Sequence, residues 1–406
     1  MTAPLRILHF ADLHIGMENY GRLDPETGLN RRVMDFLDRL DEVVDYALEH
    51  EADCVLFAGD AFRTRTPNPT YQREFARRLL RLSAAAIPTV LLVGNHDIPV
   101  MERRASSVDI FDALAVPHIT VARRPELLRL ETRRGILQIA TIPYPVRQRL
   151  LTREQFRRMR QEDLDRAVTE VVVGLIRQLA AQVDRELPAI LAGHFSVENA
   201  HWGSERNIMI GRDVTVPLSA LTDPVWDYVA LGHIHQHQNL NLTGDPPVVY
   251  PGSLERVDFG EEKHPKGFCW VEIERGQATW HFIEVPARPF RTIRVDVRSE
   301  PEPLEAIQEA VARYNLTAAV VRLVVEMSPE QEPQLRDGML SPLLTEAFFA
   351  QINREVERSA RDRLEGLEPE SLTPEHLLEH YLNGKGKSEP EIAAYLEEAR
   401  TIFHTE

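Results

Sequence analysis

Residues 7–16 read ILHFADLHIG, in which an apolar run ends at two potential metal ligands, Asp12 and His14. Residues 54–60, CVLFAGD, repeat the arrangement with an apolar run that ends at Asp60. A strand that is apolar along its length is buried on both faces, as in a layered α/β fold. Such sheets place their sites in the loops just past the carboxyl ends of the strands. The two stretches therefore predict an α/β fold with these polar side chains gathered at one edge.

Three further blocks follow apolar runs in the same way: residues 94–97 (GNHD), 193–194 (GH) and 232–235 (GHIH). Apolar residues at helical spacing, over about 33–48 and 71–85, separate the early runs. The first two blocks alone are weak, because short combinations such as Gly-Asp are common in turns, whereas 94–97 is moderately specific and 232–235 more so. Five of them in this order, each at a predicted strand end, indicate one shared site.

The ligand types indicate a two-metal phosphoesterase. Two divalent ions about 3.5–4 Å apart can make a water molecule nucleophilic and hold the phosphoryl oxygens during hydrolysis. The carboxylate of Asp60 is the candidate bridge between the two ions. Mixed imidazole and carboxylate ligands suit Mn²⁺, Fe²⁺ or Zn²⁺ better than Mg²⁺ or Ca²⁺. The remaining ligands are expected to divide into Asp12, His14 and His235 on one ion and Asn95, His194 and His233 on the other.

Two more residues of the 94–97 block are candidates for catalysis. His96 is not needed as a ligand, and a histidine near the reacting phosphate can donate a proton to the leaving oxygen. Asp97 follows directly and has two alternatives: it holds the His96 imidazole in position, or it serves as a turn residue.

On these blocks the chain resembles the calcineurin-like metallophosphoesterase superfamily and, within it, the SbcD-type nuclease subunits of DNA repair complexes. The resemblance covers about residues 1–285 well and the remainder by architecture only. The stretches that carry it are residues 7–16, 203–206 (GSER), 227–235 (DYVALGHIH), 250–254 (YPGSL), 258–262 (DFGEE) and 266–268 (KGF).

The resemblance implies a layered metallophosphoesterase β-sandwich flanked by helices, with a small α/β capping domain and C-terminal helices. It implies a Mn²⁺-dependent DNA nuclease that degrades duplex ends as a 3′–5′ exonuclease and cuts single strands or hairpins as an endonuclease. It also implies a homodimer that works with the coiled-coil ATPase SbcC. By position, it makes the seven residues named above the metal ligands and His96 the proton donor.

The pattern of residues changes near 286–292, where two prolines precede a stretch in which apolar and polar residues alternate. We therefore expect a nuclease domain over 1–286 and a C-terminal helical region over 341–406. Between them, a β-α-β module that begins at residue 287 and ends near 335 would form a capping domain over 287–340. By the resemblance, the C-terminal region would dock on the SbcC coiled coil.

Two helical segments are expected within the C-terminal region. Thr373 and Pro374 form a helix start, and the Asn- and Gly-containing turn at 383–387 predicts a hairpin of two helices. Before this hairpin, a helix is expected to place one set of apolar residues on one face: Leu343, Leu344, Ala347, Phe348 and Ile352.

Basic and aromatic residues near the blocks are candidates for DNA contact. Arg63 stands where many members of the family carry a histidine, and it either contacts phosphate or is a solvated loop residue. Arg103 and Arg104 closely follow the third block and are expected to meet DNA. The arginine-rich stretch 147–166 also holds acidic residues, which favours a solvated helix surface over a DNA track. Trp202 either stacks on a base or, the alternative we favour, anchors its loop.

Composition limits the remaining possibilities. The chain has 406 residues, 43% of them hydrophobic and 27% charged, which indicates a globular protein of two or three domains. Its net charge of −16 argues against broad non-specific binding to nucleic acid, but not against a local basic track. Two cysteines, Cys54 and Cys269, cannot build a disulfide framework, so a reducing cytoplasm is expected. Neither a signal peptide nor a membrane span is expected.

Two other functions compete with a DNA nuclease. One is a phosphodiesterase or phosphatase for a non-DNA substrate on the same scaffold. The other is a non-catalytic scaffold that recruits an ATPase. The intact ligand set weighs against the scaffold, and the additional residues 287–406 weigh against a minimal small-molecule phosphodiesterase.

Overall fold

The chain forms two compact units in a computed structural model that describes residues 3–99, 104–146, 161–203, 213–357, 373–384 and 387–403. The first unit comprises Met1–Ile293, Ala312–Leu323 and Leu344–Gln351, and the second comprises Arg294–Val311, Val324–Leu343 and Ile352–Glu406. Among the described residues, no helix is long and apolar enough to cross a membrane.

One six-stranded sheet carries the first three of the sequence blocks. Its strands, in order across the sheet, are β14 (Gln277–Glu284), β13 (Gly267–Glu274), β1 (Leu5–Phe10), β2 (Cys54–Phe57), β3 (Thr89–Leu92) and β4 (Ile119–Ala122). Strands β1 to β4 are parallel, whereas β13 is antiparallel to both β1 and β14. The carboxyl ends of β1, β2 and β3 therefore lie at the same edge.

A second six-stranded sheet carries the other two blocks. Its strands, in order, are β11 (Gln238–Asn239), β12 (Val248–Tyr250), β10 (Tyr228–Gly232), β7 (Ala189–His194), β6 (Ile136–Ile142) and β5 (Glu126–Glu131). The four inner strands are parallel, and the two edge strands are antiparallel to their neighbours. Two short strands, β8 (Ser196–Val197) and β9 (Thr215–Val216), pair separately.

The two sheets face each other across a buried apolar layer. Ile7 and Leu56 of the first sheet belong to the same cluster as Ile139, Ile190 and Ala230 of the second. The inner strands β2, β3, β7 and β10 are apolar and buried along their length because both faces are covered, as the sequence predicted. The expected layered α/β sandwich is confirmed.

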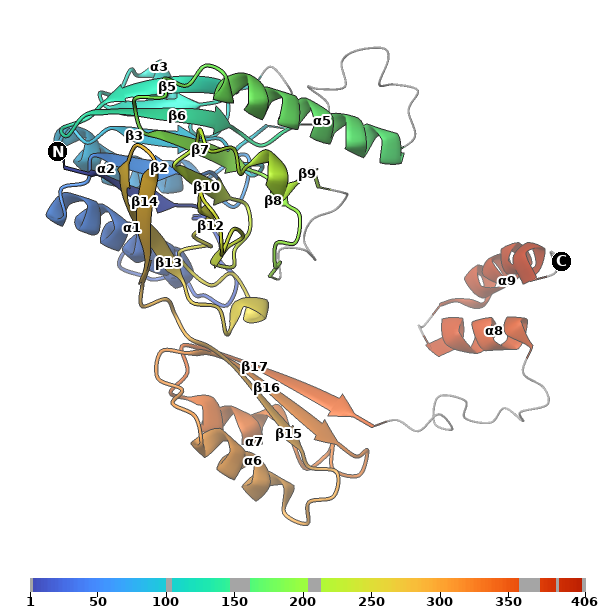
Figure 1. Ribbon diagram of the computed structural model, residues 1–406. Coiled ribbons are helices and arrows are strands. Elements are labelled where there is room, and N and C mark those ends of the chain that lie inside the picture. Colours follow the sequence, from blue (N-terminus) through green and yellow to red (C-terminus); the bar gives the residue numbers. More distant parts are fainter. Residues whose placement is uncertain are drawn as a thin grey trace. The chain divides into compact units, whose positions relative to one another are not determined.

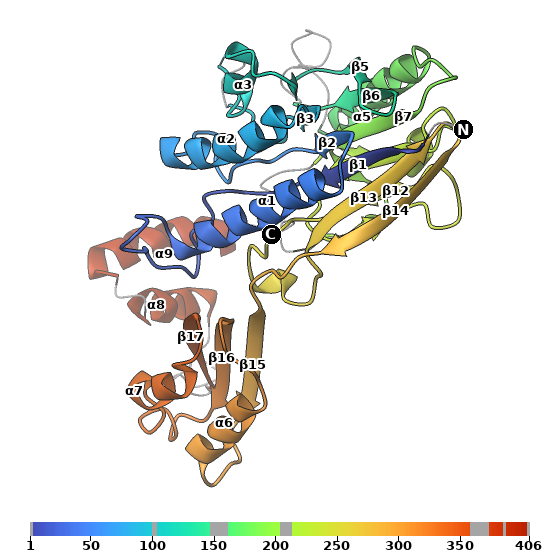
Figure 2. The ribbon, with the colours of Figure 1, turned by 90° about the vertical axis from the view of Figure 1, so that its left-hand side faces the viewer.

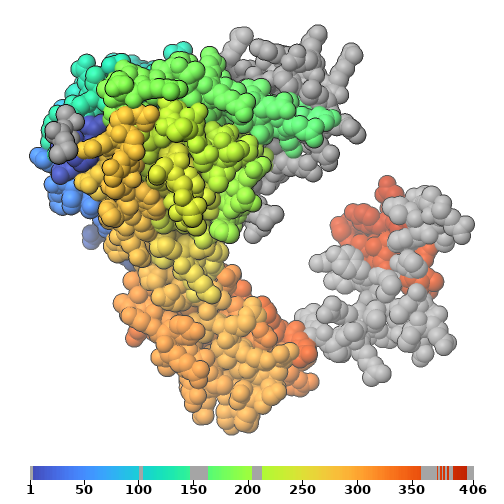
Figure 3. Space-filling model, in the orientation of Figure 1, coloured from blue at the N-terminus to red at the C-terminus, as the bar shows by residue number. Residues whose placement is uncertain are grey.

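Helices cover the outer faces of the sandwich (Figures 1 and 2). Helices α1 (Arg31–Glu49) and α2 (Pro69–Ala84) pack on the first sheet, and α5 (Gln161–Ala180) packs on the second. The side chains of Asn30 and Asn68 cap α1 and α2 by accepting backbone N–H groups of the first turn. In the space-filling view, α5 and β14 form part of the visible surface (Figure 3). A short helix, α3 (Asp109–Ala113), leads into β4.

The expected β-α-β module is confirmed as β15 (Phe290–Asp296), α6 (Pro303–Ala312) and β16 (Val320–Met327). The prediction of a helix that carries residues 343–352 is wrong. Residues Ser341–Leu344 form a 3-10 turn after the short helix α7 (Asp337–Leu340), and Phe349–Val356 is a strand, β17. β17 is the third strand of the β15-β16-β17 sheet. Pairing in a sheet satisfies the backbone of this segment, and it outweighs a helical spacing of only five apolar residues.

The expected helical hairpin is confirmed as α8 (Pro374–Gly384) and α9 (Glu389–Phe403), which lie against each other. The Thr373 hydroxyl accepts a hydrogen bond from the backbone N–H of His376 at 3.4 Å. The Glu391 carboxylate accepts both the backbone N–H and the hydroxyl of Ser388, at 3.0 and 2.7 Å. Both contacts are typical of helix starts.

Candidate metal centre

The five sequence blocks meet at one edge of the sandwich. Asp12, Asp60 and Asn95 follow strands β1, β2 and β3 of the first sheet, while His194 ends β7 of the second. His233 comes directly after β10. Since the strands that carry these blocks are parallel within each sheet, their carboxyl ends bring the side chains together from two directions.

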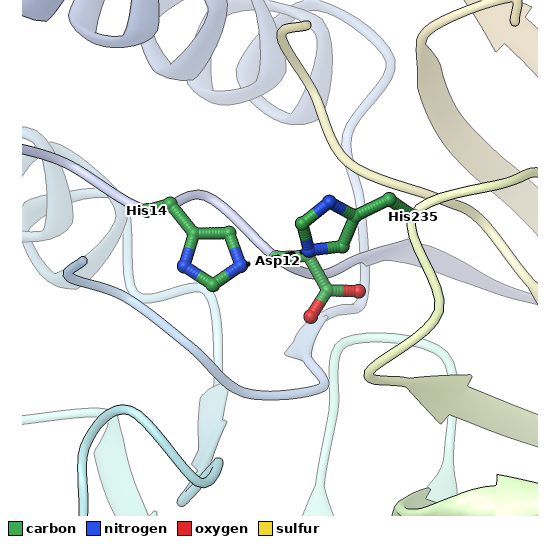
Figure 4. A group of neighbouring side chains, drawn as sticks. All are labelled: Asp12, His14 and His235. Atoms are coloured by element: carbon green, nitrogen blue, oxygen red, sulfur yellow. Dashed lines mark hydrogen bonds between the residues drawn. The ribbon is translucent and has the colours of Figure 1, made fainter. Parts of the chain in front are cut away.

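The first cluster comprises Asp12, His14 and His235, whose potential ligand atoms all lie within 4.8 Å of one another (Figure 4). The Nε2 atoms of His14 and His235 are 2.9 Å apart. Two imidazole nitrogens at this distance require a proton or a cation between their lone pairs. The three side chains are buried, so they are held for a shared ligand rather than for solvent.

The second cluster surrounds Asn95. Its Oδ1 atom lies 3.0 Å from His194 Nε2 and 3.0 Å from His233 Nδ1. Asp60 lies between the clusters, with its Oδ2 atom 3.8 Å from His14 Nε2 and 3.5 Å from His194 Nε2. The structure thus brings all seven expected ligands together, with Asp60 in the position of a bridge.

An unusual backbone conformation sets the direction of several of these side chains. Asp12, His14, Asp60 and His233 all have positive φ, at 52°, 47°, 63° and 103°. Non-glycine residues rarely adopt this region, and such strain concentrates at functional sites. Four such residues in one small region indicate that the loops are built to direct the side chains.

Two glycines allow the sheets to approach each other at this edge. A Cβ on Gly59 would lie 2.4 Å from the ring of His194, and one on Gly232 would lie 2.1 Å from the carbonyl oxygen of Ala58. The glycines of the sequence blocks therefore let the two halves of the site meet.

His96 lies beside the clusters, and a nitrogen of its ring is within 4.8 Å of potential ligand atoms of both His14 and Asp60. Its backbone N–H donates to Asp60 Oδ1 at 2.8 Å, and its ring lies edge-on to that of His14. Its Nδ1 atom is 2.7 Å from the carbonyl oxygen of Arg63, which leaves Nε2 available for proton transfer. Because residue 63 contacts His96 through its backbone, an arginine at this position is compatible with the orientation of His96.

Asp97 faces the backbone rather than His96. Its carboxylate accepts hydrogen bonds from the N–H groups of Asp60, Ala61 and Gly94, at 2.9, 3.2 and 3.0 Å, and from the Ser107 hydroxyl at 2.9 Å. Burial and the neighbouring Asp60 carboxylate raise the pKa of Asp97 to about 6. Of its two expected roles, these contacts fit that of a turn residue that holds the Asp60 and Gly94 loops together.

Three histidines of the site have a partner on their other nitrogen. His194 Nδ1 is 2.6 Å from the carbonyl oxygen of Ala58. His233 Nε2 is 2.7 Å from Asp213, and His235 Nδ1 is 2.7 Å from Glu261. Such outer partners fix which nitrogen of a histidine can bind a metal.

Sequence reasoning missed the roles of Asp213 and Glu261. Glu261 lies in the DFGEE stretch that carried the family resemblance, which was its only signal. Asp213 had none. Burial alone would raise the pKa of Glu261, but Lys266 and His235 hold it well below its ordinary value.

The site carries negative charge that basic side chains do not balance. In the described parts of the chain, no lysine or arginine forms an ion pair with Asp12 or Asp60. Burial would raise the pKa of Asp60, but the imidazoles of His194 and His96 hold it well below its ordinary value. Burial opposes protonation of His194, yet the Asp60 carboxylate raises its pKa to about 9. Buried carboxylates surrounded by imidazoles fit a site for divalent cations.

Only some of the residues that were weighed as DNA contacts lie in the described part of the chain. The Arg63 guanidinium is 3.5 Å from Asn19 Oδ1, and Arg104 is exposed. Arg103 lies outside the described residues, as does most of the stretch 147–166. Trp202 is half-buried and packs on the core of the second sheet, with its ring centroid 5.8 Å from that of His233.

The sequence profile of calcineurin-like phosphoesterases matches residues 5–237, and the chain belongs to this family. The DNA double-strand break repair protein Mre11 of Haloferax volcanii is 28% identical over 343 residues. That match covers 84% of this chain, which spans 64% of the length of the Haloferax protein. The SbcD subunit of the nuclease SbcCD of Bacillus subtilis is 28% identical over 285 residues, or 69% of each chain.

Among solved structures, a dimetal phosphatase from Danio rerio superposes with a TM-score of 0.39 at 10% identity. The superposition covers 69% of this chain and 99% of that one. The family membership and the two relatives support a phosphodiester hydrolase, and the clustered His and Asp side chains support binding of divalent metal ions.

Proposed function

We propose that the chain is a metal-dependent DNA nuclease of the SbcD type. The observation that carries the proposal is the convergence of seven potential ligands from two sheets, with Asp60 between two clusters. Membership of the phosphoesterase family and similarity to two relatives named for DNA repair and nuclease activity support DNA as the substrate. By the resemblance, the activities would be 3′–5′ exonuclease on duplex ends and endonuclease on single strands and hairpins.

The ligand set would hold two metal ions, which we propose to be Mn²⁺. Asp12, His14 and His235 would bind one ion, and Asn95, His194 and His233 the other, with Asp60 shared by both. Bound there, the ions would make water nucleophilic at neutral pH and balance charge on the phosphate.

His96 would act on the leaving group. Its Nδ1–H donates to the Arg63 carbonyl, so the ring is held and its Nε2 can deliver a proton to the leaving oxygen. Asp97 would act indirectly, because it ties the Asp60 and Gly94 loops together. The side chains of Arg63, Arg103 and Arg104 are proposed to contact the DNA backbone.

The remaining parts of the chain are proposed to serve the same function. Residues 1–286 would be the nuclease domain, and 287–340, together with strand β17, a capping domain. The helices within 341–406 would bind an SbcC-like coiled-coil ATPase. The protein would act as a homodimer. The two buried free thiols, Cys54 and Cys269, are compatible with a reducing cytoplasm.

Incubation of the full chain with Mn²⁺ and end-labelled duplex, hairpin and single-stranded DNA tests the proposal. We expect cleavage of DNA that stops when EDTA is added. Inactivity on all three DNA substrates, combined with turnover of a small phosphodiester, would contradict it and favour a phosphodiesterase for a non-DNA substrate.

A deletion tests the proposed partner surface. Removal of the residues after about 370 should leave Mn²⁺-dependent cutting of single strands intact but abolish co-purification with an SbcC-like ATPase. Association that persists in the deletion variant would place the partner surface elsewhere.

A further inference from the structure

A fully buried ion pair lies behind His235. Glu261 and Lys266 both have 0% exposure, and Glu261 Oε2 is 2.8 Å from Lys266 Nζ. Glu261 ends a 3-10 turn, η4 (Phe259–Glu261), and Lys266 directly precedes strand β13. A buried ion pair is weak evidence for stability, because apolar residues of similar size often stabilise a protein as well or better. The contacts of the pair indicate another role.

The pair holds His235 at two points. Glu261 Oε1 accepts the Nδ1–H of His235 at 2.7 Å, and Lys266 Nζ donates to the carbonyl oxygen of His235 at 3.2 Å. The other polar atoms are also satisfied. Lys266 Nζ donates to the Ser253 hydroxyl at 2.7 Å, and Glu261 Oε2 accepts the Val257 N–H at 2.9 Å. Neither charged group can turn away without losing buried hydrogen bonds.

The contact with Glu261 selects one tautomer of His235. A carboxylate that accepts at Nδ1 keeps the proton on that nitrogen and leaves the lone pair on Nε2. It is Nε2 that faces Asp12 and His14 in the first cluster (Figure 4). With no acceptor at Nδ1, the proton can move to Nε2, and the ring can no longer bind a cation there.

His194 provides a contrast within the same site. Its Nδ1 faces the neutral carbonyl of Ala58, which belongs to the sandwich itself. The outer partner of His235 is instead a charged side chain, which comes from the η4 turn between β12 and β13. Lys266 supplies the opposite charge that keeps a carboxylate ionised at this buried place.

We propose that Glu261 and Lys266 form a positioning pair that fixes His235 as an Nε2 ligand and thereby sets the metal affinity of the Asp12–His14–His235 cluster. The inference rests on the proposed two-metal site. It assigns the pair to metal binding and not to the stability of the fold.

The double variant Glu261→Leu with Lys266→Met tests the inference, because it removes both charges together and leaves neither unpaired. Titration calorimetry with Mn²⁺ should show one of two ions binding 10–100-fold more weakly, the usual effect of removing an outer partner. Thermal unfolding of the metal-free variant should show only a modest change of Tm, because no charge is left unpaired although the Val257 N–H and the Ser253 hydroxyl lose a partner. The control is Asp53→Asn with Arg134→Met, which removes an ion pair between a buried carboxylate and a half-buried guanidinium at the amino end of β2 and should leave Mn²⁺ affinity unchanged.

A second variant separates positioning from packing. Glu261→Gln with Lys266→Met keeps an oxygen that can accept from His235, so it should recover part of the Mn²⁺ affinity at a similar Tm. Wild-type Mn²⁺ affinity in the Glu261→Leu double variant would overturn the inference. The inference would also be overturned if the Leu and Gln double variants lost the same amount of affinity and the same amount of Tm. A wild-type protein that binds no Mn²⁺ would contradict the proposed function itself, which is a distinguishable result.

Discussion

Asp53 and Asp60 lie on either side of the same buried strand, β2, and both carboxylates are almost completely buried. Asp53, at the amino end, is 2.9 Å from the Arg134 guanidinium and accepts the backbone N–H of Arg6 at 2.9 Å. Asp60, at the carboxyl end, faces imidazoles and backbone N–H groups. A buried charge is unfavourable unless it is paired. The amino end therefore contains its own counter-charge, whereas the carboxyl end is built to receive one.

The largest expected difference between the two ends is in catalysis. Asp60→Asn should reduce Mn²⁺-dependent DNA cleavage by at least about 10³-fold, or about 4 kcal/mol in activation free energy, because the shared ligand of both ions is lost. Asp53→Asn should leave the cleavage rate within about twofold of the wild type. Initial rates on end-labelled single-stranded DNA measure both. A rate for Asp60→Asn above a tenth of the wild-type rate would mean that the two ends of β2 do not differ in catalysis as proposed.

A smaller loss is expected for the residue beside the ligands. His96→Asn should slow cleavage by about 10²–10⁴-fold, because general acid catalysis typically contributes this much. Mn²⁺ binding should remain at the wild-type level, since His96 is not assigned to either ion. Calorimetry and single-turnover rates on the same preparation test this pair of outcomes. Full activity would exclude His96 as the proton donor, and lost Mn²⁺ binding would make it a ligand.

Metal binding should also stabilise the fold through the carboxyl end. At a Mn²⁺ concentration of about 100 times Kd, the free energy of unfolding should rise by about 2.7 kcal/mol per site, and EDTA should reverse the effect. Urea denaturation with and without Mn²⁺ measures the gain. Asp53→Asn should retain it and Asp60→Asn should lose it. An equal gain in both variants would mean that Mn²⁺ binds elsewhere.

Asp53, at the amino end of β2, should contribute to the stability of the fold but not to metal binding or catalysis. Asp53→Asn leaves Arg134 with only the exposed Glu51 as a charged partner and should lower the free energy of unfolding by about 2 kcal/mol. Urea denaturation in EDTA isolates this effect from metal binding. A change of Mn²⁺ affinity in this variant would show that the two ends of the strand are coupled.

His9, near the carboxyl end of neighbouring strand β1, should give the smallest effect, and only at acidic pH. Burial lowers the pKa of His9 from 6.5 to about 3, and its nitrogens contact the Tyr228 hydroxyl and the Leu231 carbonyl oxygen. Its stabilising contribution is therefore complete above about pH 6.5 and falls as the pH drops towards 3. Between pH 7.5 and 5.5, the wild type should lose about 1.4 kcal/mol more stability than His9→Gln. Parallel pH dependence of both proteins would show that His9 is not held neutral.

The parts of the fold that the sequence predicted are those with a local signal. Each ligand block directly follows an apolar strand, so position in the sequence was enough to place Asp12, Asp60 and Asn95 at one edge. The strand β17 had no such signal, because its conformation depends on pairing with β16 in the folded protein. A few apolar residues at helical spacing were therefore misleading.

The parts of the site that the sequence did not predict depend on contacts between distant residues. Glu261 lies 26 positions from His235, and Asp213 lies 20 positions from His233. Neither pairing has a fixed spacing that a pattern could show. The Arg63 position looked like a departure from the family pattern, yet its contact with His96 is made by a backbone oxygen that any residue has.

The number of divalent ions bound per chain tests the central claim most directly. Equilibrium dialysis of the wild-type protein against Mn²⁺, followed by metal analysis, should give two ions per chain, and Asp53→Asn should give the same number. Zero or one ion per wild-type chain would contradict the account, because the buried carboxylates at the carboxyl end would then be balanced in some other way.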